Sequence, residues 1–229
     1  MISILIPAYN EEKRIKPFLK ELKAFLKTFK KPYEVLLVND GSTDKTVDVV
    51  KSYSIPNLRI VSHERNRGKG AAIKTGLLKA RGEKIMFMDA DGSIPAKEIE
   101  KMDKLLDHHH FATGSRIIKG SKITCKQPIH RIIAGRVFNQ IVNWMFDVGT
   151  KDTLCGFKGV RKDLGKKLAK KMISTGWEFD VELLARTKKM GYDIGVFPIE
   201  WHDVRGSRLS VLRDPIKMFF GLLKLRTKI

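Results

Sequence analysis

The stretch Ile85-Met86-Phe87-Met88-Asp89-Ala90-Asp91-Gly92 joins four apolar residues directly to two carboxylates that stand one residue apart. Earlier in the chain, residues 2–6, 35–38 and 58–61 form short apolar runs of the same kind. Runs that are apolar on both faces are typical of strands covered on both sides of a sheet. The four runs therefore predict four buried strands, the last of which ends in a pair of carboxylates.

Segments with helical spacing of apolar residues separate these runs, over residues 11–29, 43–53 and 69–80. Strands that alternate with helices of about ten residues or more indicate βαβ units. We therefore predict an α/β fold with a mostly parallel central sheet and helices on both of its faces.

Polar residues follow three of the predicted strands, at residues 9–11, 40–42 and 89–91. Ligands of open α/β sheets bind at the edge formed by the carboxyl ends of the strands. The pattern therefore predicts a nucleotide site at that edge. After about residue 115 the regularity fades, and residues 117–128 indicate a loop with several basic side chains.

The chain has 229 residues, of which 42% are hydrophobic and 31% charged, a balance that predicts one globular domain with a sizeable core. It excludes collagen-like, disordered and disulfide-scaffold proteins. Against 25 Asp and Glu stand 45 Lys and Arg, which gives a net charge of +20. This charge indicates an anionic partner, such as nucleic acid, a phosphorylated metabolite or an acidic membrane surface. A lysine-rich solvated surface would explain part of the same excess.

Cys125 and Cys155 are the only cysteines and form no CxxC pair, so we expect neither a zinc ribbon nor a redox motif. We expect the protein to reside in a reducing compartment. The first apolar run has no basic lead-in and stops at Pro7, which is too early for a signal peptide. No other apolar run approaches the roughly 18 residues of a membrane-spanning helix. We therefore expect a protein that is soluble or associated with a membrane from one side.

Asp89 and Asp91 carry the strongest chemical signal. Two carboxylates one residue apart at a strand end can both reach one hard cation, Mg²⁺ or Mn²⁺, which takes further ligands from waters and substrate phosphates. Such a cation would neutralise charge that develops on a diphosphate leaving group. The alternative is a turn in which an Asp caps a helix that begins near residues 95–96.

Residues 66–71, Asn-Arg-Gly-Lys-Gly-Ala, open the helix that follows the third strand. The glycines allow close approach of a phosphate, and Arg67, Lys69 and the helix N-terminus supply positive potential. The spacing is neither that of a P-loop nor that of the dinucleotide-binding fingerprint. Three consecutive histidines, residues 108–110, point in different directions on any regular element, so we interpret them as solvated surface.

Two later segments are unusually apolar for helices. Residues 131–147 carry only a narrow polar stripe, and residues 215–226 carry lysines along one edge. The second segment could pack in the core or in a dimer interface, or both could lie in the membrane interface with lysines at the headgroups. We expect one domain over residues 1–210, followed by an amphipathic C-terminal helix over residues 211–229.

Eight strings occur in an order that covers the chain from residue 2 to about residue 209. They are residues 6–12, 38–44, 66–70, 89–92, 114–116, 152–158, 177–184 and 206–209. Together they resemble the inverting family-2 glycosyltransferases with the Rossmann-like GT-A fold. Within that family they are most similar to the dolichyl-phosphate glucosyltransferases and mannose synthases, and more to the glucosyl branch.

The resemblance implies a role for each residue that matches a family motif. It implies that the nucleotide sugar contacts Pro7, Ala8, Tyr9, Glu11, Asp40, Lys69, Asp89 and Ala90, with Asp40 reading the base edge. It implies that Mg²⁺ or Mn²⁺ is bound by Asp89 and Asp91. It also implies that the diphosphate and the acceptor phosphate lie near Arg116, Arg131, Arg205 and Arg208.

With Asp91, we nominate Asp152 as a catalytic carboxylate that acts as a general base or positions the acceptor. Alternatively, Asp152 satisfies backbone N–H groups of its own loop. A lipid phosphate is already an anion at pH 7, so orientation and charge neutralisation could replace a base. Two positions depart from the family pattern: Arg208 stands where lysine is usual, and Ser93 stands where the mannose synthases have glutamine.

We therefore expect an inverting glycosyltransferase that moves a sugar from a nucleotide sugar, with UDP-glucose or another UDP-hexose favoured, to a polyprenyl or dolichyl phosphate. The alternatives are a GDP-mannose-dependent mannosyltransferase and a family-2 transferase with a saccharide or protein hydroxyl acceptor. We expect a cytoplasmic enzyme held at the inner face of the membrane, where each lysine near an anionic leaflet contributes about 1 kcal/mol. A nucleic-acid-binding module and a non-catalytic lipid-surface scaffold are rival interpretations from other classes.

Overall fold

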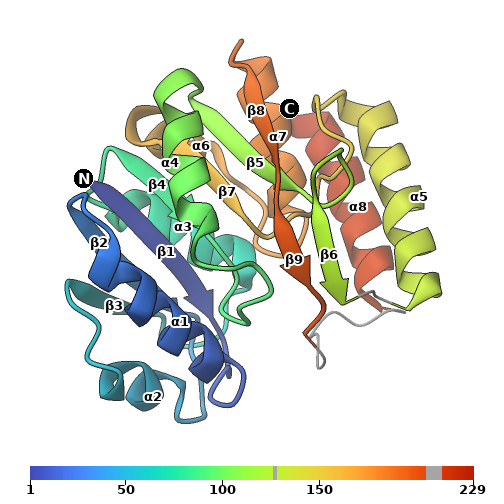
Figure 1. Cartoon of the computed structure of the whole chain (residues 1–229). Coiled ribbons are helices and arrows are strands. Elements are labelled where there is room, and N and C mark those ends of the chain that lie inside the picture. The colour runs from blue at the N-terminus through green and yellow to red at the C-terminus, as the bar shows by residue number, and fades with distance from the viewer. Residues whose placement is uncertain (126–127, 205–212) are drawn as a thin grey trace.

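The computed structural model describes residues 1–125, 128–204 and 213–229, with residues 130, 131 and 213–216 described by their backbone alone. Its central sheet has seven strands in the order β3-β2-β1-β4-β7-β5-β8 (Figure 1). The strands are β1 (Ile2–Ala8), β2 (Tyr33–Asn39), β3 (Leu58–Ser62), β4 (Lys84–Phe87), β5 (Phe111–Ser115), β7 (Lys158–Arg161) and β8 (Ile194–Pro198). Neighbouring strands pair in parallel, except that β7 is antiparallel to both β4 and β5. The predicted mostly parallel α/β sheet is confirmed.

Burial on both faces of the sheet explains why β1, β2 and β4 are largely apolar runs. The edge strand β3 is half-buried, so the prediction that it is a buried strand is wrong. In β1, Ile4 and Ile6 face one hydrophobic core, and Leu5 between them faces a second core on the opposite side. Ser3 is the one polar residue inside this strand, and its buried hydroxyl donates a hydrogen bond of 2.6 Å to Glu34 on β2. A buried polar group that is hydrogen-bonded avoids the desolvation penalty, so the strand tolerates it.

Helices cover both faces of this sheet, as predicted. The first core is closed by α1 (Ile15–Thr28), α2 (Thr46–Ser52) and α4 (Glu98–His108), and the second by α3 (Lys69–Lys79), α6 (Lys162–Lys171) and α7 (Phe179–Lys189). The buried residues of α1 recur at helical spacing, as in Phe18, Leu22 and Leu26. Their packing against the sheet, more than helix propensity, holds the helix in place.

The remaining elements lie beside this three-layer unit. A short parallel pair joins β6 (Lys122–Cys125) to β9 (Glu200–His202), so the interpretation of residues 117–128 as a loop is wrong over β6. The two predicted apolar helices are present as α5 (Ile129–Phe146) and α8 (Arg213–Lys228), which pack side by side (Figure 1). In the described part of the chain, neither these helices nor the others have the length and apolar character to cross a bilayer.

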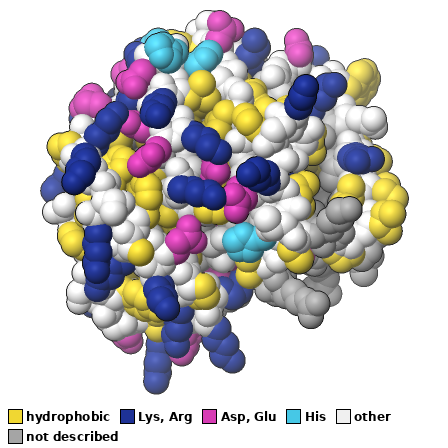
Figure 2. Space-filling model, in the orientation of Figure 1, with side chains coloured by type: hydrophobic (Ala, Val, Ile, Leu, Met, Phe, Trp, Pro, Cys, Tyr) yellow, Lys and Arg dark blue, Asp and Glu magenta, His cyan; other side chains and the backbone are white. Residues whose placement is uncertain are grey.

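Basic and acidic side chains are mixed on the face of the molecule that Figure 2 shows. Figure 2 shows Lys and Arg side chains scattered over one face of the molecule with acidic side chains among them, and no single basic stripe on that face. Such mixing is typical of a solvated surface. The net charge of +20 therefore reflects many separate lysines at least in part.

Candidate active site

The carboxyl ends of β1, β2 and β4 meet at one edge of the sheet. Ala8 at the end of β1 is the register partner of Asn39 at the end of β2, and Leu5 of β1 pairs with Phe87 at the end of β4. A cavity of about 660 Å³ opens at this edge. Its lining includes the predicted residues Pro7, Ala8, Tyr9, Glu11, Asp40, Lys69, Asp89, Ala90, Asp91 and Arg116.

The structure thus brings ten predicted site residues, drawn from positions 7 to 116, to one cavity. Asp152 is not part of the lining but lies directly behind Arg116. The side chain of Arg131 and all of Arg205 and Arg208 lie outside the described residues. Their roles, and those of the ten lining residues, stay predictions.

Both carboxylates of the Asp89–Asp91 turn are ion-paired with cationic side chains of this chain. Lys69, at the start of α3, places its Nζ 2.5 Å from Asp89 Oδ1. Arg14, which precedes α1, places its Nη2 2.7 Å from Asp91 Oδ2. The backbone N–H of Ser93 donates to the other oxygen of Asp91, at 3.0 Å. This last bond lies within the turn, whereas α4 begins at Glu98 with no side-chain cap, so the helix-capping alternative is wrong. Asp91 both shapes the turn and lines the cavity.

Lys69 lies in a strongly anionic and partly aromatic environment. Its Nζ is 5.0 Å from the centre of the Trp177 ring, an arrangement that favours a cation. Burial would lower the pKa of Lys69, but the carboxylates of Asp89, Asp180 and Asp91 outweigh burial and raise that pKa. Lys69 is therefore a fixed positive charge on the floor of the cavity.

Gly156 makes room for Asp89. A Cβ added at Gly156 would lie 2.3 Å from Asp89 Oδ2 and 2.8 Å from its Cγ, far inside van der Waals contact. A larger residue in place of the glycine of the Leu-Cys-Gly-Phe string would therefore displace the Asp89 carboxylate. The string was part of the family resemblance, but nothing in the sequence relates Gly156 to Asp89.

The donor set fits a magnesium or manganese ion that is shared with a substrate. Asp89 and Asp91 offer hard carboxylate oxygens on the wall of a cavity large enough for a nucleotide. Within the described ranges, no group of three or more His, Cys, Asp or Glu side chains could hold a metal ion by itself. Mg²⁺ is commonly held by one or two carboxylates plus substrate phosphates, and this pair matches that pattern.

Asp40 organises the loop that precedes α3. Its carboxylate, 2% exposed, accepts hydrogen bonds from the backbone N–H groups of Arg67 at 3.0 Å and Gly68 at 2.8 Å. The φ of Gly68 is +95°, and a Cβ there would lie 2.2 Å from the carbonyl oxygen of Thr175, so only glycine suits this position. As the structure stands, the Asp40 carboxylate holds the loop that frames the cavity.

His63 is a site-supporting residue that the sequence analysis missed. Its Nδ1 lies 2.6 Å from Asp40 Oδ1, and its Nε2 lies 2.9 Å from the hydroxyl oxygen of Thr75. The imidazole therefore bridges α3 to Asp40 and fixes the orientation of that carboxylate. An isolated histidine after β3 carries no sequence signal for this role, because its partners are 23 and 12 residues away.

Arg116 and Asp152 form a bidentate ion pair in which Asp152 is buried and Arg116 is partly exposed. The guanidinium donates from Nε and Nη2 to the two carboxylate oxygens, at 2.9 and 2.6 Å, and the backbone N–H of Arg116 donates at 2.8 Å. Burial would raise the pKa of Asp152, but the charge and hydrogen bonds of Arg116 outweigh burial and lower that pKa. A carboxylate with a lowered pKa is a weak base, so this geometry favours the positioning role over the general base.

Asp152→Asn is expected to destabilise the protein by about 1.5–3 kcal/mol at neutral pH, the usual worth of hydrogen bonds to a charged group. Because the pKa of Asp152 is lowered in the folded state, its contribution is present above about pH 4 and is lost as the pH falls through the folded pKa. Urea unfolding should therefore show a gap between wild type and variant at pH 7 that closes in acid. An unchanged gap at both pH values would contradict the ion-pair assignment.

Part of the cavity lining is apolar and comes from the two late helices. Ala134, Gly135 and Phe138 of α5 form this part, together with Met218 of α8. Asp180, at the start of α7, also lines the cavity and pairs with the fully buried Lys158. The cavity therefore combines a charged floor at the sheet edge with an apolar side formed by the two late helices.

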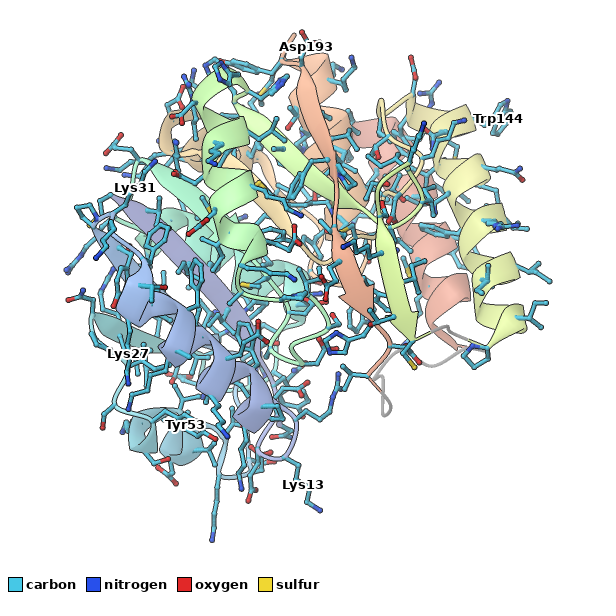
Figure 3. The ribbon with its side chains drawn as sticks, in the orientation of Figure 1. Lys13, Lys27, Lys31, Tyr53, Trp144 and Asp193 are labelled. Atoms are coloured by element: carbon cyan, nitrogen blue, oxygen red, sulfur yellow. The ribbon has the colours of Figure 1, made fainter. Side chains whose placement is uncertain are left out.

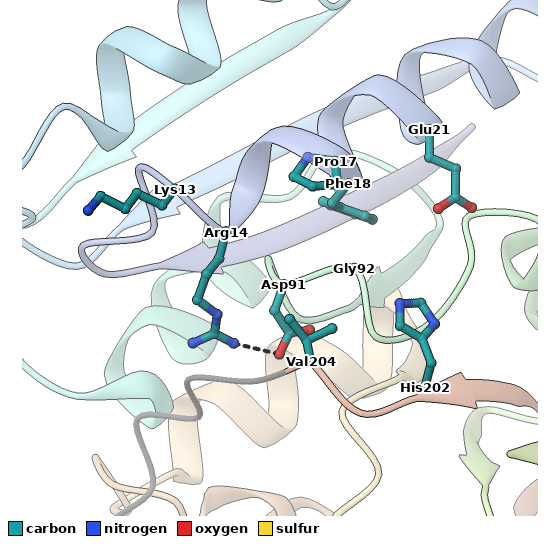
Figure 4. Close-up of a pocket in the computed structure, with 9 residues that line it drawn as sticks. All are labelled: Lys13, Arg14, Pro17, Phe18, Glu21, Asp91, Gly92, His202 and Val204. Carbon is teal, nitrogen blue, oxygen red and sulfur yellow. Dashed lines mark hydrogen bonds and ion pairs between the residues drawn. The ribbon is translucent and has the colours of Figure 1, made fainter. Parts of the chain in front are cut away.

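A smaller side cavity of about 370 Å³ adjoins the site (Figure 4). Arg14 and Asp91 line both cavities, and Figure 4 shows the guanidinium of Arg14 extended toward the carboxylate of Asp91. The side cavity is also lined by Lys13, Pro17, Phe18, Glu21, Gly92, His202 and Val204.

Comparison with known proteins assigns the family. The family model for "Glycosyl transferase family 2" matches residues 3–168, well over half of the chain. The chain belongs to glycosyl transferase family 2. This confirms the resemblance seen in the sequence motifs, and the protein is a glycosyltransferase.

Two relatives of this family 2 glycosyltransferase extend over nearly the whole chain. A dolichyl-phosphate beta-glucosyltransferase of Trichomonas vaginalis is 32% identical over 237 residues, which cover 97% of this chain and 70% of the relative. The human dolichyl-phosphate beta-glucosyltransferase is 30% identical over 243 residues, which cover 99% of this chain and 75% of the relative.

Solved structures agree on the fold. Glucosyl-3-phosphoglycerate synthase of Mycobacterium tuberculosis, in a complex with Mn²⁺, UDP and glucosyl-3-phosphoglycerate, has a TM-score of 0.73 at 18% identity. The match covers 98% of this chain and 78% of that protein. TarS of S. aureus in a complex with UDP-GlcNAc has a TM-score of 0.65 at 21% identity, covering 98% of this chain and 65% of that protein. The predicted GT-A fold of this glycosyltransferase is confirmed.

Proposed function

We propose that this glycosyltransferase transfers glucose from UDP-glucose to a polyprenyl or dolichyl phosphate, with inversion at the anomeric carbon. The observation that carries the proposal is the mixed lining of the cavity, which combines charged groups at the sheet edge with apolar residues of α5 and α8. A nucleotide diphosphate and a phosphorylated lipid need these two environments side by side. Relatives about 30% identical that are named dolichyl-phosphate beta-glucosyltransferases support the sugar and the acceptor.

In the proposed reaction, an oxygen of the lipid phosphate bonds to the anomeric carbon while the bond to UDP breaks on the opposite side. The bonding electron pair leaves with the diphosphate. A doubly ionised phosphate brings no proton to the reaction, so no general base is required. A Mg²⁺ or Mn²⁺ ion held by Asp89 and Asp91 would neutralise the charge that develops on the diphosphate.

The residues of the chain supply orientation and positive charge in this scheme. Lys69, fixed beside Asp89, contributes a cation on the floor of the cavity. Arg116, held in a single orientation by Asp152, presents the rest of its guanidinium to the cavity for an acceptor or donor phosphate. Preorganised charges of this kind stabilise developing charge without reorganisation during the reaction.

The nucleotide half of the proposal is tested by calorimetry of UDP and GDP, with and without Mn²⁺, on wild type and Asp91→Ala. We expect UDP binding that Mn²⁺ strengthens in the wild type and not in Asp91→Ala. Asp193→Ala is the matched control, since Asp193 is exposed and lies at the far end of the molecule from the site (Figure 3). Preference for GDP would favour a mannosyl donor, and binding of neither nucleotide would contradict the proposal.

The acceptor half is tested by transfer assays with detergent-solubilised polyprenyl phosphate and a panel of nucleotide sugars. We expect glucose transfer to the lipid phosphate, with the sugar attached to the phosphate oxygen. Transfer to saccharide or protein hydroxyls, with none to the lipid phosphate, would replace the acceptor assignment while keeping the nucleotide site.

We further propose that α5 and α8 rest on the cytoplasmic face of a membrane, so that the lipid acceptor reaches the apolar part of the cavity lining. Both helices expose large apolar side chains, although neither is long and apolar enough over its described residues to cross a membrane. The exposed apolar residues are Ile129, Ile133, Val137 and Trp144 on α5 and Phe219, Phe220 and Leu223 on α8. Trp144 is 88% exposed and projects outward from the helix (Figure 3). Exposed Lys217, Lys224 and Lys228 on α8 suit an anionic leaflet.

Vesicle flotation with anionic and neutral lipids tests the membrane contact. The double variant Ile133→Ser, Phe220→Ser is expected to lose most of its vesicle binding, because it removes two exposed apolar side chains from the proposed membrane surface. It should still fold, because substitutions of exposed side chains change stability little. The matched control is Leu78→Ser, Ile173→Ser, which removes two exposed apolar residues elsewhere. Equal loss in both variants, or none in either, would contradict the proposed surface.

A further inference from the structure

The two carboxylates of the Asp89–Asp91 turn have cationic partners in different surroundings. Lys69, beside Asp89, lies against the Trp177 ring and belongs to the floor of the cavity. Arg14, beside Asp91, extends from the segment before α1 toward that carboxylate (Figure 4), and it lines both the main cavity and the side cavity. Its side chain is 20% exposed, so it can change position at lower cost than a side chain locked in the core.

The carboxylate oxygen of Asp91 that a divalent cation could bind is already occupied by the Arg14 guanidinium. Nη2 of Arg14 lies 2.7 Å from Asp91 Oδ2, so a cation that binds this oxygen meets a positive charge at short range. Glu11 Oε2 lies 3.6 Å from Arg14 Nε and offers a second carboxylate to the guanidinium. The adjoining side cavity gives the side chain space to withdraw from Asp91.

We propose that Arg14 is an internal competitor of the divalent cation at Asp91 and thereby makes cation binding depend on nucleotide binding. The inference rests on the metal-dependent transfer proposed above. Without nucleotide, Arg14 neutralises Asp91 and the cation binds weakly. A nucleoside diphosphate supplies further anionic oxygens for the cation, and the cation held in this way replaces Arg14 as the counter-ion of Asp91. By linkage, the cation and the nucleotide then strengthen each other's binding by the same factor.

Titration of Mn²⁺, followed by the electron paramagnetic resonance signal of the free ion, tests this with and without UDP. Arg14→Gln is expected to bind Mn²⁺ alone at least about tenfold more tightly than wild type, because a positive charge beside the ligand is gone. The strengthening of Mn²⁺ binding by UDP should shrink correspondingly. Arg14→Met, which keeps the aliphatic stem, should behave in the same way, and thermal unfolding checks that both variants fold.

Lys13→Gln is the matched control, because it removes one positive charge from the adjacent, exposed residue. It is expected to change Mn²⁺ affinity by less than about twofold, since a solvated charge is screened. In an Asp91→Asn background, Arg14→Gln should give no gain in Mn²⁺ affinity. That result would tie the competition to this carboxylate and not to net charge.

Equal or weaker Mn²⁺ binding by Arg14→Gln, or an equal gain in Lys13→Gln, overturns the inference. If the wild type binds Mn²⁺ and UDP together but Arg14→Gln leaves their coupling unchanged, only this inference fails. If neither protein binds Mn²⁺ with or without UDP, while UDP itself binds, the inference fails together with the metal part of the proposed function.

Discussion

Gly156→Ala is expected to remove UDP–Mn²⁺ binding and sugar transfer from an enzyme that still folds. The added Cβ would meet Asp89 Oδ2 at 2.3 Å, so the carboxylate must leave its place beside Lys69. The backbone of Gly156 is not among the positive-φ glycines, so alanine is compatible with the local conformation. Misplacement of a catalytic group by about 1 Å can cost about 100-fold in rate, and we expect a loss of at least this size.

Gly135→Ala is the control for this prediction. Gly135 also lines the cavity, on the α5 side, but nothing lies within 4 Å of a Cβ added there. Calorimetry should therefore show UDP–Mn²⁺ binding close to that of the wild type, and thermal unfolding should show both variants folded. Normal UDP–Mn²⁺ binding by Gly156→Ala would contradict the assignment of Asp89 to the cation and nucleotide.

The parallel half of the sheet was predictable because three of its strands, β1, β2 and β4, are largely buried on both faces. Residues 2–6, 35–38 and 85–88 are largely apolar runs for that reason, and helices separate them at the spacing of βαβ units. The meeting of the site residues at one place was also predictable, because parallel strands bring their carboxyl ends to one edge of the sheet. The cavity lined by residues from Pro7 to Arg116 is the consequence.

Two strands of the second half, β7 and β6, could not be predicted in the same way. The antiparallel strand β7 contributes only Lys158–Arg161, and it inserts between β4 and β5 through pairings that no local pattern encodes. All four residues of β6 are exposed, so this strand has no alternation of buried and exposed residues to reveal it. Short strands of this kind are defined by their tertiary partners and not by their own composition.

The side-chain contacts within the site could not be predicted from the sequence either, because the partners are far apart along the chain. Arg14 and Asp91 are 77 residues apart, and Arg116 and Asp152 are 36 apart. Motifs identified which residues belong to the site, but the choice of partner depends on side-chain geometry. The ion pair with Arg116 illustrates the consequence, because it makes Asp152 a weaker base than its residue type alone suggests.

Lys158→Met is expected to destabilise the protein by about 3–5 kcal/mol, the usual cost of leaving one member of a buried ion pair without its partner. Lys158 is fully buried, and its Nζ donates to Asp180 Oδ1 and to the carbonyl oxygen of Cys155, both at 2.6 Å. Methionine fills a similar volume but satisfies neither oxygen. Urea unfolding at neutral pH measures the change.

The loss should depend on pH in a direction set by Asp180. Burial raises the pKa of Asp180, and the charges of Lys158 and Lys69 oppose that effect. Without Lys158 the pKa of Asp180 rises further, so the folded variant retains a proton that the unfolded chain releases near pH 4. A folded state that binds more protons loses stability as the pH rises through this window. The deficit should therefore be larger at about pH 8 than at about pH 5.

Two variants separate this buried pair from a general effect of lost lysine. Lys162→Met removes a neighbouring lysine whose partner, Glu83, is largely exposed, and it should change stability far less. In the double variant Lys158→Met, Asp180→Asn, the buried carboxylate is gone, so much of the lost stability and most of the added pH dependence should return. A Lys158→Met protein as stable as wild type, or a deficit independent of both pH and Asp180, would show that the ion pair does not hold β7 to α7.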